Sequence, residues 1–137
     1  MNILIVEDNP AHQRITEYAL KRSKIPIVIN VVRDGLEALD YLLGRNEFSD
    51  PTKAPTPDII LLDLNLPKHD GREVLKVIKG DATLKDIPVV IVSTSDREED
   101  VNYAFQMGAV AYISKSSGFD KFNEQLANIA QYARPTS

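Results

Sequence analysis

The sequence contains no cysteine among its 137 residues. This absence excludes disulfide bonds, thiolate nucleophiles and cysteine-ligated zinc sites, and it favours a cytoplasmic location. No apolar run approaches the roughly 20 residues that a membrane-spanning helix needs, so we expect no contact with a membrane. The run ILIV at Ile3 is followed at once by the acids Glu7 and Asp8, which is unlike a signal peptide.

Basic residues are also too few for a nucleic-acid-binding surface. The 16 lysines and arginines face 20 acidic residues, giving a net charge of -4, and no basic stripe is present. Hydrophobic residues make up 43% of the chain and charged residues 26%, an ordinary balance for a globular protein. The length predicts one domain over residues 1–137, with no output domain.

Short β-branched runs recur five times along the chain. They mostly do not alternate between apolar and polar residues, which is typical of parallel strands covered on both faces. We predict five strands at these runs, which are ILIV at Ile3, IVINVV at Ile27, IILL at Ile59, VVIV at Val89 and VAYI at Val110.

The segments between these runs carry apolar residues at helical spacing. Alternating strands and helices predict an α/β fold, a doubly wound (βα)5 unit with right-handed crossovers and a parallel sheet. Gly108 is placed to end the fourth helix, and Pro135 closes the chain after the last one. Residues 44–57, which hold three prolines, are expected to form the one long loop. The spaced residues are Ile15, Ala19 and Leu20; Leu36, Leu39 and Leu43; Val74, Leu75 and Ile78; Val101, Ala104 and Phe105; and Phe119, Phe122, Leu126, Ile129 and Ala133.

Polar residues follow four of the predicted strands. In an open parallel sheet, ligands bind at the carboxyl ends of the strands, near the point where the winding order reverses. With strand order 2-1-3-4-5, the first and third strands are neighbours about 4.8 Å apart, so their acids converge on one point. The residues at these strand ends are Glu7, Asp8, Asp63, Ser93, Thr94 and Lys115.

The chemistry of this set indicates phosphoryl transfer. Three converging carboxylates repel one another unless a cation is present, and oxygen ligands suit Mg²⁺, with Mn²⁺ as a substitute. Ser93 offers a hydroxyl to a phosphate, and Lys115 has a stem long enough to bring its ammonium to the same place. We therefore predict that Asp63 is a nucleophile, while the metal and Lys115 neutralise phosphate oxygens.

Nearly the whole chain resembles the receiver domain of two-component response regulators. VED at residues 6–8 is similar to the family's metal-binding acids, although Asp-Asp is the commoner pair there. LLDLNLPKHDG at residues 61–71 resembles the phosphoacceptor segment, with Asp63 as the acceptor. The resemblance implies that Asn65 lends its backbone carbonyl to the metal, and Pro67 and Gly71 fall where the family's loop has them.

The last two strands resemble the family as well. IPVVIVSTS at residues 87–95 implies that Ser93 supplies the switch hydroxyl and that Thr94 takes the small-residue position beside the phosphoryl group. MGAVAYISK at residues 107–115 implies that Tyr112 is the rotating aromatic and Lys115 the phosphate-binding lysine.

The resemblance implies a flavodoxin-like receiver fold and a signalling protein that catalyses only its own phosphotransfer and dephosphorylation. A sensor histidine kinase donates the phosphoryl group, so His12 and His69 are interpreted as surface residues. Output passes through protein contacts, a downstream phosphotransfer protein or dimerisation.

The long loop and SKS at residues 114–116 resemble stand-alone regulators that partner bacterial and cyanobacterial phytochromes. Ser116 replaces the family's usual proline, so the loop either takes a different path or carries a costly non-proline cis bond.

The resemblance also suggests how phosphate becomes output. A phosphoryl group that draws Ser93 inward leaves space into which Tyr112 can turn. This move biases a surface made of the fourth helix, fifth strand and fifth helix, which we expect to mediate homodimerisation. The surface includes Tyr103, Tyr112, Phe119 and Phe122, although the simpler interpretation places Phe122, and with it Phe119, in the core.

Rival functions fit less well. A haloacid-dehalogenase-type phosphatase needs Asp-x-Asp after its first strand, and a topoisomerase-primase-type nuclease needs a later Asp-x-Asp where Asn65 stands. A flavodoxin needs a Ser/Thr/Gly-rich phosphate loop in place of Glu7 and Asp8. The remaining alternative is a receiver-shaped interaction module that never takes phosphate, although all of the key positions are chemically intact.

Overall fold

The five apolar runs form the strands of one parallel sheet. The computed structural model describes residues 1–23, 25–66 and 70–133, so Pro67, His69 and Pro135 lie outside the described residues. The strands are β1 (Asn2–Val6), β2 (Val28–Val32), β3 (Ile59–Leu62), β4 (Val89–Ser93) and β5 (Ala111–Ser114). The helices are α1 (Pro10–Leu20), α2 (Gly35–Leu43), α3 (Gly71–Gly80), α4 (Glu98–Gln106) and α5 (Phe119–Ala127), with the 3-10 helices η1 (Asn46–Phe48) and η2 (Ile129–Tyr132).

The strand order β2-β1-β3-β4-β5 confirms the predicted doubly wound topology. β1 pairs in parallel with β2 and β3, and the register places Val6 opposite Leu62. At the other side of the sheet, β4 and β5 align Ser93 with Ser114. The carboxyl ends of these strands therefore open at one edge of the sheet, where a doubly wound fold binds its ligands.

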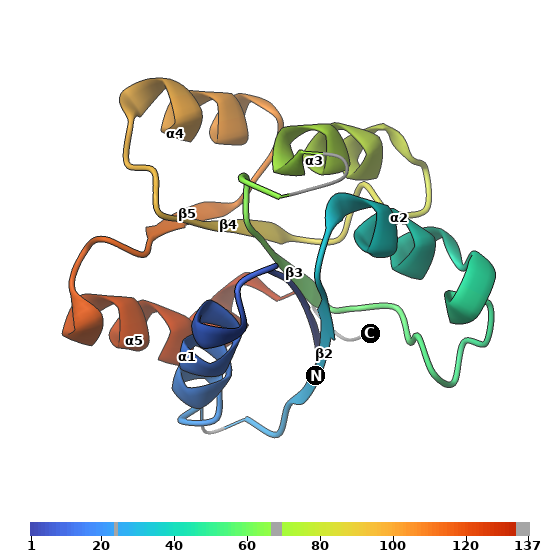
Figure 1. Ribbon diagram of the computed structural model, residues 1–137, viewed down its shortest axis with the longest axis horizontal. Coiled ribbons are helices and arrows are strands. Elements are labelled where there is room, and N and C mark those ends of the chain that lie inside the picture. Colours follow the sequence, from blue (N-terminus) through green and yellow to red (C-terminus); the bar gives the residue numbers. More distant parts are fainter. Residues whose placement is uncertain (24, 67–69, 134–137) are drawn as a thin grey trace.

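Helices cover both faces of the sheet (Figure 1). α1 and α5 pack on one face, and α2, α3 and α4 pack on the other. Each face contributes its own apolar layer, centred on fully buried residues such as Leu4 and Ile60 on one side and Ile3 and Ile59 on the other. Within the described ranges, no helix has both the length and the apolar character that a membrane span requires.

Several apolar residues at helical spacing lie at the surface instead of the core. In α1, Ile15 is exposed, whereas its polar neighbour Thr16 is buried. Leu36, Leu43 and Phe105 are exposed as well. The edge strand β2 is less covered than predicted, because an outer strand has a neighbour on one side only.

The last helix is shorter than its spacing predicts. α5 ends at Ala127, and the chain continues through Asn128 into η2, so no α-helix reaches Ala133. Asn128 turns its amide back to the carbonyl of Glu124 at 3.0 Å, a local bond that competes with helix propagation. Gly108 agrees with its prediction, since it follows α4 with a φ of 99° that favours glycine.

The two phenylalanines of α5 lie in different surroundings. Phe122 is buried in the layer between α1, α5 and the sheet. Phe119, at the start of the helix, is 64% exposed. Placement in the core is therefore confirmed for Phe122 and wrong for Phe119.

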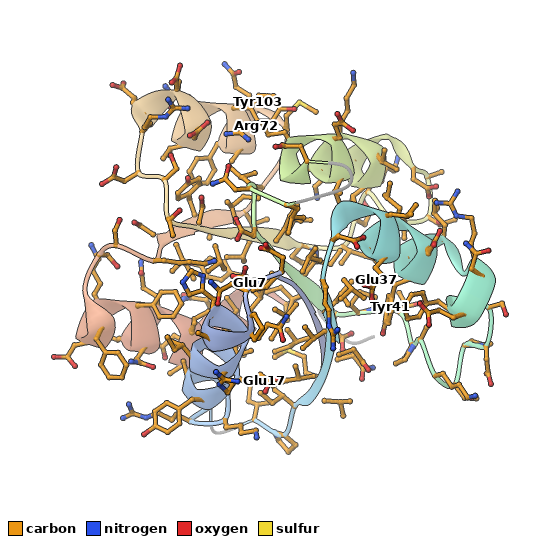
Figure 2. All side chains as sticks on the ribbon, in the orientation of Figure 1. Glu7, Glu17, Glu37, Tyr41, Arg72 and Tyr103 are labelled. Atoms are coloured by element: carbon orange, nitrogen blue, oxygen red, sulfur yellow. The ribbon has the colours of Figure 1, made fainter. Side chains whose placement is uncertain are left out.

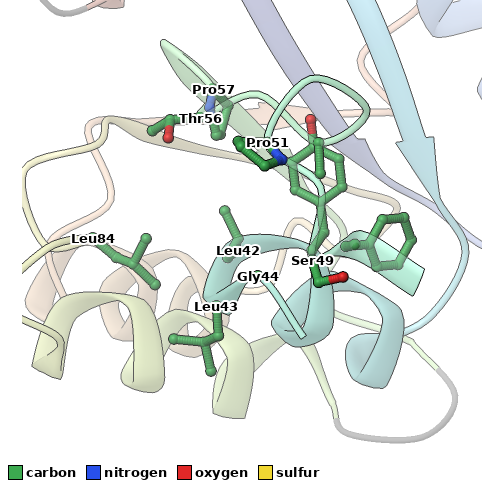
Figure 3. Close-up of a pocket in the computed structure, with 11 residues that line it drawn as sticks. Leu42, Leu43, Gly44, Ser49, Pro51, Thr56, Pro57 and Leu84 are labelled. Carbon is green, nitrogen blue, oxygen red and sulfur yellow. The ribbon is translucent and has the colours of Figure 1, made fainter. Parts of the chain in front are cut away.

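Residues 44–57 form a loop, as predicted, but it contains the short helix η1. The loop folds back on α2, where the ring centroids of Tyr41 and Phe48 lie 5.3 Å apart. The Tyr41 hydroxyl also donates to the carbonyl oxygen of Pro55 at 2.9 Å. A pocket of about 220 Å³ lies under this loop, with Leu42 and Leu84 among its lining residues (Figure 3). None of the predicted site residues lines this pocket.

Candidate functional site

Neighbouring strand ends bring the predicted acids together. The register of β1 and β3 continues one residue beyond the strands, because the Asp63 N–H donates to the Val6 carbonyl at 3.1 Å. On the other side of β1, the Glu7 N–H donates to the Val32 carbonyl at 3.0 Å. Glu7, shown at the end of β1 in Figure 2, and Asp63 therefore start from fixed positions of adjacent backbones.

Three carboxylates converge at this edge. Glu7, Asp8 and Asp63 each place an oxygen within 4.8 Å of the others, the one such acidic group among the described residues. Glu7 is 3% exposed and Asp63 is 7% exposed, while Asp8 is open to solvent. Buried carboxylates this close are costly without a cation, and oxygen donors alone suit Mg²⁺ or Mn²⁺. The residues present therefore fit a hard divalent ion.

Lys115 reaches the same point from the end of β5. Its ammonium lies 3.0 Å from Asp63 Oδ2 and also contacts Glu7 Oε1. Burial raises the pKa of Glu7 to about 7, although the contact with Lys115 opposes this rise. Near neutral pH, Glu7 therefore holds a proton for part of the time, and a bound cation would displace it.

His12 lies at the surface, as interpreted from the sequence, with its side chain 35% exposed, and it also contacts this cluster. Its Nδ1 lies 3.2 Å from Lys115 Nζ and 3.6 Å from Glu7 Oε1. Burial, together with the Lys115 ammonium, lowers the pKa of His12 below its ordinary value. Because an ammonium can only donate, the neutral imidazole accepts this bond through Nδ1. The cap at Asn9 and the proline at Pro10 start α1 so that His12 follows half a turn later, on the side of the site.

The loop after Asp63 is held tightly against α3. The Asn65 N–H donates to Asp63 Oδ1 at 2.9 Å, which fixes one carboxylate oxygen. The Gly71 N–H donates to the Leu64 carbonyl at 2.9 Å. A Cβ on Gly71 would lie 2.1 Å from the Asp63 carbonyl oxygen, so only glycine allows this approach of helix and loop.

The two hydroxyl residues at the end of β4, Ser93 and the following Thr94, differ in exposure. Ser93 is the last residue of β4 and is fully buried, and its Oγ accepts from the Ser95 N–H at 3.1 Å. Thr94 is exposed. β5 keeps this strand end in register, because the Lys115 N–H donates to the Ser93 carbonyl at 2.7 Å. Ser93 thus lies one strand away from Asp63, as predicted.

Tyr112 and Ser116 flank the site on the β5 side. Tyr112 is half-buried against the core, and its hydroxyl donates to the Ser95 carbonyl at 2.7 Å. The described peptide bonds are all trans, so the chain passes Ser116 without the cis bond considered above. The Ser116 N–H donates to Ser114 Oγ at 3.2 Å, which gives this loop a local turn instead.

Comparison with known proteins agrees with this geometry. A family model described as the response regulator receiver domain matches residues 3–127. The chain is 40% identical over 130 residues to the response regulator Rcp1 of Synechocystis sp., which covers 95% of this chain and 86% of Rcp1.

Solved structures give the same result. The phosphorylated cyanobacterial phytochrome response regulator RcpA has a TM-score of 0.86 at 44% identity, covering 96% of this chain and 91% of RcpA. The Mn²⁺-bound form of Rcp1 has a TM-score of 0.85 at 40% identity, covering 96% of this chain and 92% of Rcp1. The chain therefore belongs to the response regulator receiver domain family.

Proposed function

We propose that this receiver domain accepts a phosphoryl group on Asp63 from a sensor histidine kinase and signals through protein contacts. The observation that carries the proposal is the position of the Asp63 carboxylate, 3.0 Å from the Lys115 ammonium and grouped with Glu7 and Asp8. A carboxylate with this surrounding is available as a nucleophile, and the nearby positive charge offsets the charge of an incoming phosphate.

The phosphotransfer step follows from these contacts. An Asp63 oxygen attacks phosphorus, the bond from phosphorus to the donor histidine nitrogen breaks, and the departing imidazole takes up a proton. Asn65 holds Oδ1 through its N–H, which leaves Oδ2, the oxygen beside Lys115, as the attacking atom. Lys115 then pairs with a phosphoryl oxygen, and Ser93 donates its hydroxyl to another. Thr94 borders the phosphoryl group.

A divalent ion belongs to this proposal. Glu7, Asp8, Asp63 and the backbone carbonyl of Asn65 would hold Mg²⁺, which neutralises phosphate oxygens during the transfer. Mn²⁺ would serve as well, in keeping with the Mn²⁺-bound form of the relative Rcp1. Because all of these ligands are oxygens, they would exclude metals that prefer nitrogen or sulfur.

Mg²⁺ affinity should rise with pH. A metal needs the ionised carboxylate, and burial raises the pKa of Glu7 to about 7, so protons compete with the ion below that pH. We expect the affinity to fall about tenfold for each pH unit below about pH 7. Titration calorimetry across this range measures the effect. Glu7→Gln has no carboxyl to titrate and should flatten the profile; parallel profiles for the two proteins would contradict the role of Glu7.

The partners follow from the relatives. RcpA is a phytochrome response regulator, and we infer that the kinase paired with this chain is a phytochrome as well. The chain would catalyse only its own phosphotransfer and dephosphorylation, and a downstream phosphotransfer protein would be the recipient in a longer relay. A relay component would exchange phosphate with these partners, whereas a binding module would contact its partners without taking phosphate.

Phosphorylation would act on the surface of α4, β5 and α5. Tyr103, Tyr112 and the exposed Phe119 lie on these elements, whereas the buried Phe122 is not available there. We expect phosphate or beryllofluoride to shift a monomer–dimer equilibrium through this surface, and Ser93→Ala to remove that shift while still taking phosphate. Sedimentation velocity with and without beryllofluoride measures the shift; an unchanged wild-type sedimentation coefficient would contradict this output.

The direct test of the proposed function is phosphate uptake. The wild-type protein is incubated with acetyl phosphate and Mg²⁺, and intact mass spectrometry follows the gain of one phosphoryl group. Peptide mapping should place the gain on the segment that contains Asp63, and a chelator should abolish it. No gain in the presence of Mg²⁺ would favour the binding module.

A further inference from the structure

Ser95, in the loop between β4 and α4, connects two parts of the proposed switch. Its N–H donates to Ser93 Oγ at 3.1 Å, and its carbonyl oxygen accepts from the Tyr112 hydroxyl at 2.7 Å. The backbone of Ser95 therefore contacts both the buried Ser93 hydroxyl and the Tyr112 side chain of β5. The position of Ser95 consequently decides how both are oriented.

A buried carboxylate holds Ser95 in turn. The Ser95 hydroxyl donates to Asp100 Oδ2 at 2.6 Å, and Arg72 Nη2 donates to Asp100 Oδ1 at 2.6 Å. Arg97 adds a longer bond of 3.3 Å from the solvent side. The Asp100 side chain is only 6% exposed, and these bonds, first of all that from Ser95, lower its pKa to about 2. Charge-assisted bonds of this length hold a group firmly.

Arg72 connects this carboxylate to the start of α3, which packs against Asp63. Arg72 follows Gly71, the residue whose backbone packs on Asp63, and its Nη1 also lies 3.2 Å from Asp70. On the other side, the Tyr103 hydroxyl donates to the Arg72 carbonyl at 3.4 Å, and both side chains are seen between α3 and α4 in Figure 2. The contacts thus run from the loop after β3, across α3 and α4, to the loop after β4.

We propose that Asp100 is a positioning residue of the phosphorylation switch, because it fixes Ser95 and thereby orients Ser93 and Tyr112. The inference rests on the function proposed above. The hydrogen bond from the Ser95 N–H occupies a lone pair of Ser93 Oγ. The hydrogen of the Ser93 hydroxyl therefore stays available for a phosphoryl oxygen. A loop that is fixed before the phosphoryl group arrives does not need to be ordered during the transfer. Asp100 itself does not touch the phosphoryl group.

The test uses two variants that remove different links. Asp100→Asn removes the charge that holds Ser95 and Arg72, and Ser95→Ala removes only the hydroxyl while leaving the pair of Arg72 and Asp100 intact. Glu99→Gln is the matched control, since Glu99 directly precedes Asp100 in α4, its side chain is 71% exposed, and it pairs with the exposed Arg97. Phosphate uptake from acetyl phosphate is followed by intact mass. In the same proteins, ¹⁹F NMR of fluorotyrosine reports on Tyr112, whose signal is assigned with Tyr112→Phe.

We expect Asp100→Asn and Ser95→Ala to slow phosphate uptake about tenfold, since misplacing a group by about 1 Å can cost on the order of 100-fold. Both variants should also shift the Tyr112 signal without any phosphate present, whereas Glu99→Gln should change neither. A folded Ser95→Ala protein with wild-type uptake and a wild-type Tyr112 signal would overturn the inference. If the wild type took no phosphate, the proposed function would fail, and the Tyr112 signals would still decide whether Asp100 positions the loop.

Discussion

Asp63→Asn is expected to take up no phosphate under conditions in which the wild type gains one phosphoryl group. An amide oxygen is a far weaker nucleophile than a carboxylate, and the change also removes one of three acidic ligands for the metal. Lys115 would keep its contact with Glu7, so the site should remain folded. Intact mass after incubation with acetyl phosphate and Mg²⁺ measures the loss.

A matched control separates this loss from a general effect of removing a negative charge. Asp86 is exposed and lies before β4, at the opposite end of that strand from Ser93, so Asp86→Asn should take up phosphate as the wild type does. Thermal unfolding of both variants shows whether they are folded. A full phosphoryl gain in folded Asp63→Asn would rule out Asp63 as the acceptor.

Gly71→Ala should destabilise the fold by about 3 kcal/mol and also abolish phosphate uptake. The added Cβ would lie 2.1 Å from the Asp63 carbonyl oxygen and 2.6 Å from Leu64 Cα. Both are backbone atoms that cannot rotate away, so α3 must move and the bond from the Gly71 N–H to the Leu64 carbonyl must lengthen. That movement displaces Asp63, the proposed acceptor. Urea unfolding and phosphate uptake measure the two effects.

Gly80 provides the control within the same helix. It is the last residue of α3, and a Cβ there would meet no atom within 4 Å. Gly80→Ala should therefore leave phosphate uptake unchanged and stabilise the helix by about 0.5 kcal/mol or more. Equal unfolding free energies for Gly71→Ala and Gly80→Ala would show that the tight approach at Gly71 does not constrain the fold.

The sheet and the cluster at its edge were predictable because both depend on short apolar runs. The run IILL is short, fully apolar and partly β-branched, which is typical of a buried parallel strand. Asp63, the acid that follows it, must then lie at the carboxyl end of the sheet. The convergence of Asp63 with Glu7 needs only the strand order, which the doubly wound topology supplies. The same argument predicts the position of Lys115, which follows β5, two strands away from β3.

Other features depend on side-chain direction, which spacing alone does not determine. Arg72 and Asp100 are 28 residues apart on two helices, and charged residues on helices are usually solvated, so nothing in the pattern indicates that the Asp100 carboxylate is buried and paired with Arg72. His12 was missed for a similar reason, since its direction depends on where α1 begins. The excess length predicted for α5 arises because 3-10 and α-helical segments both return apolar residues to one side every three to four positions.

The contact between Lys115 and Glu7 joins residues 108 positions apart in the chain. During synthesis, β1 can pair with β2 early, but the acids of the site meet their cation only after β5 has been made. A nascent chain that ends before β5 therefore presents mutually repelling carboxylates without the Lys115 ammonium. The complete group of acids and ammonium therefore exists only once the chain through Lys115 has been made and folded.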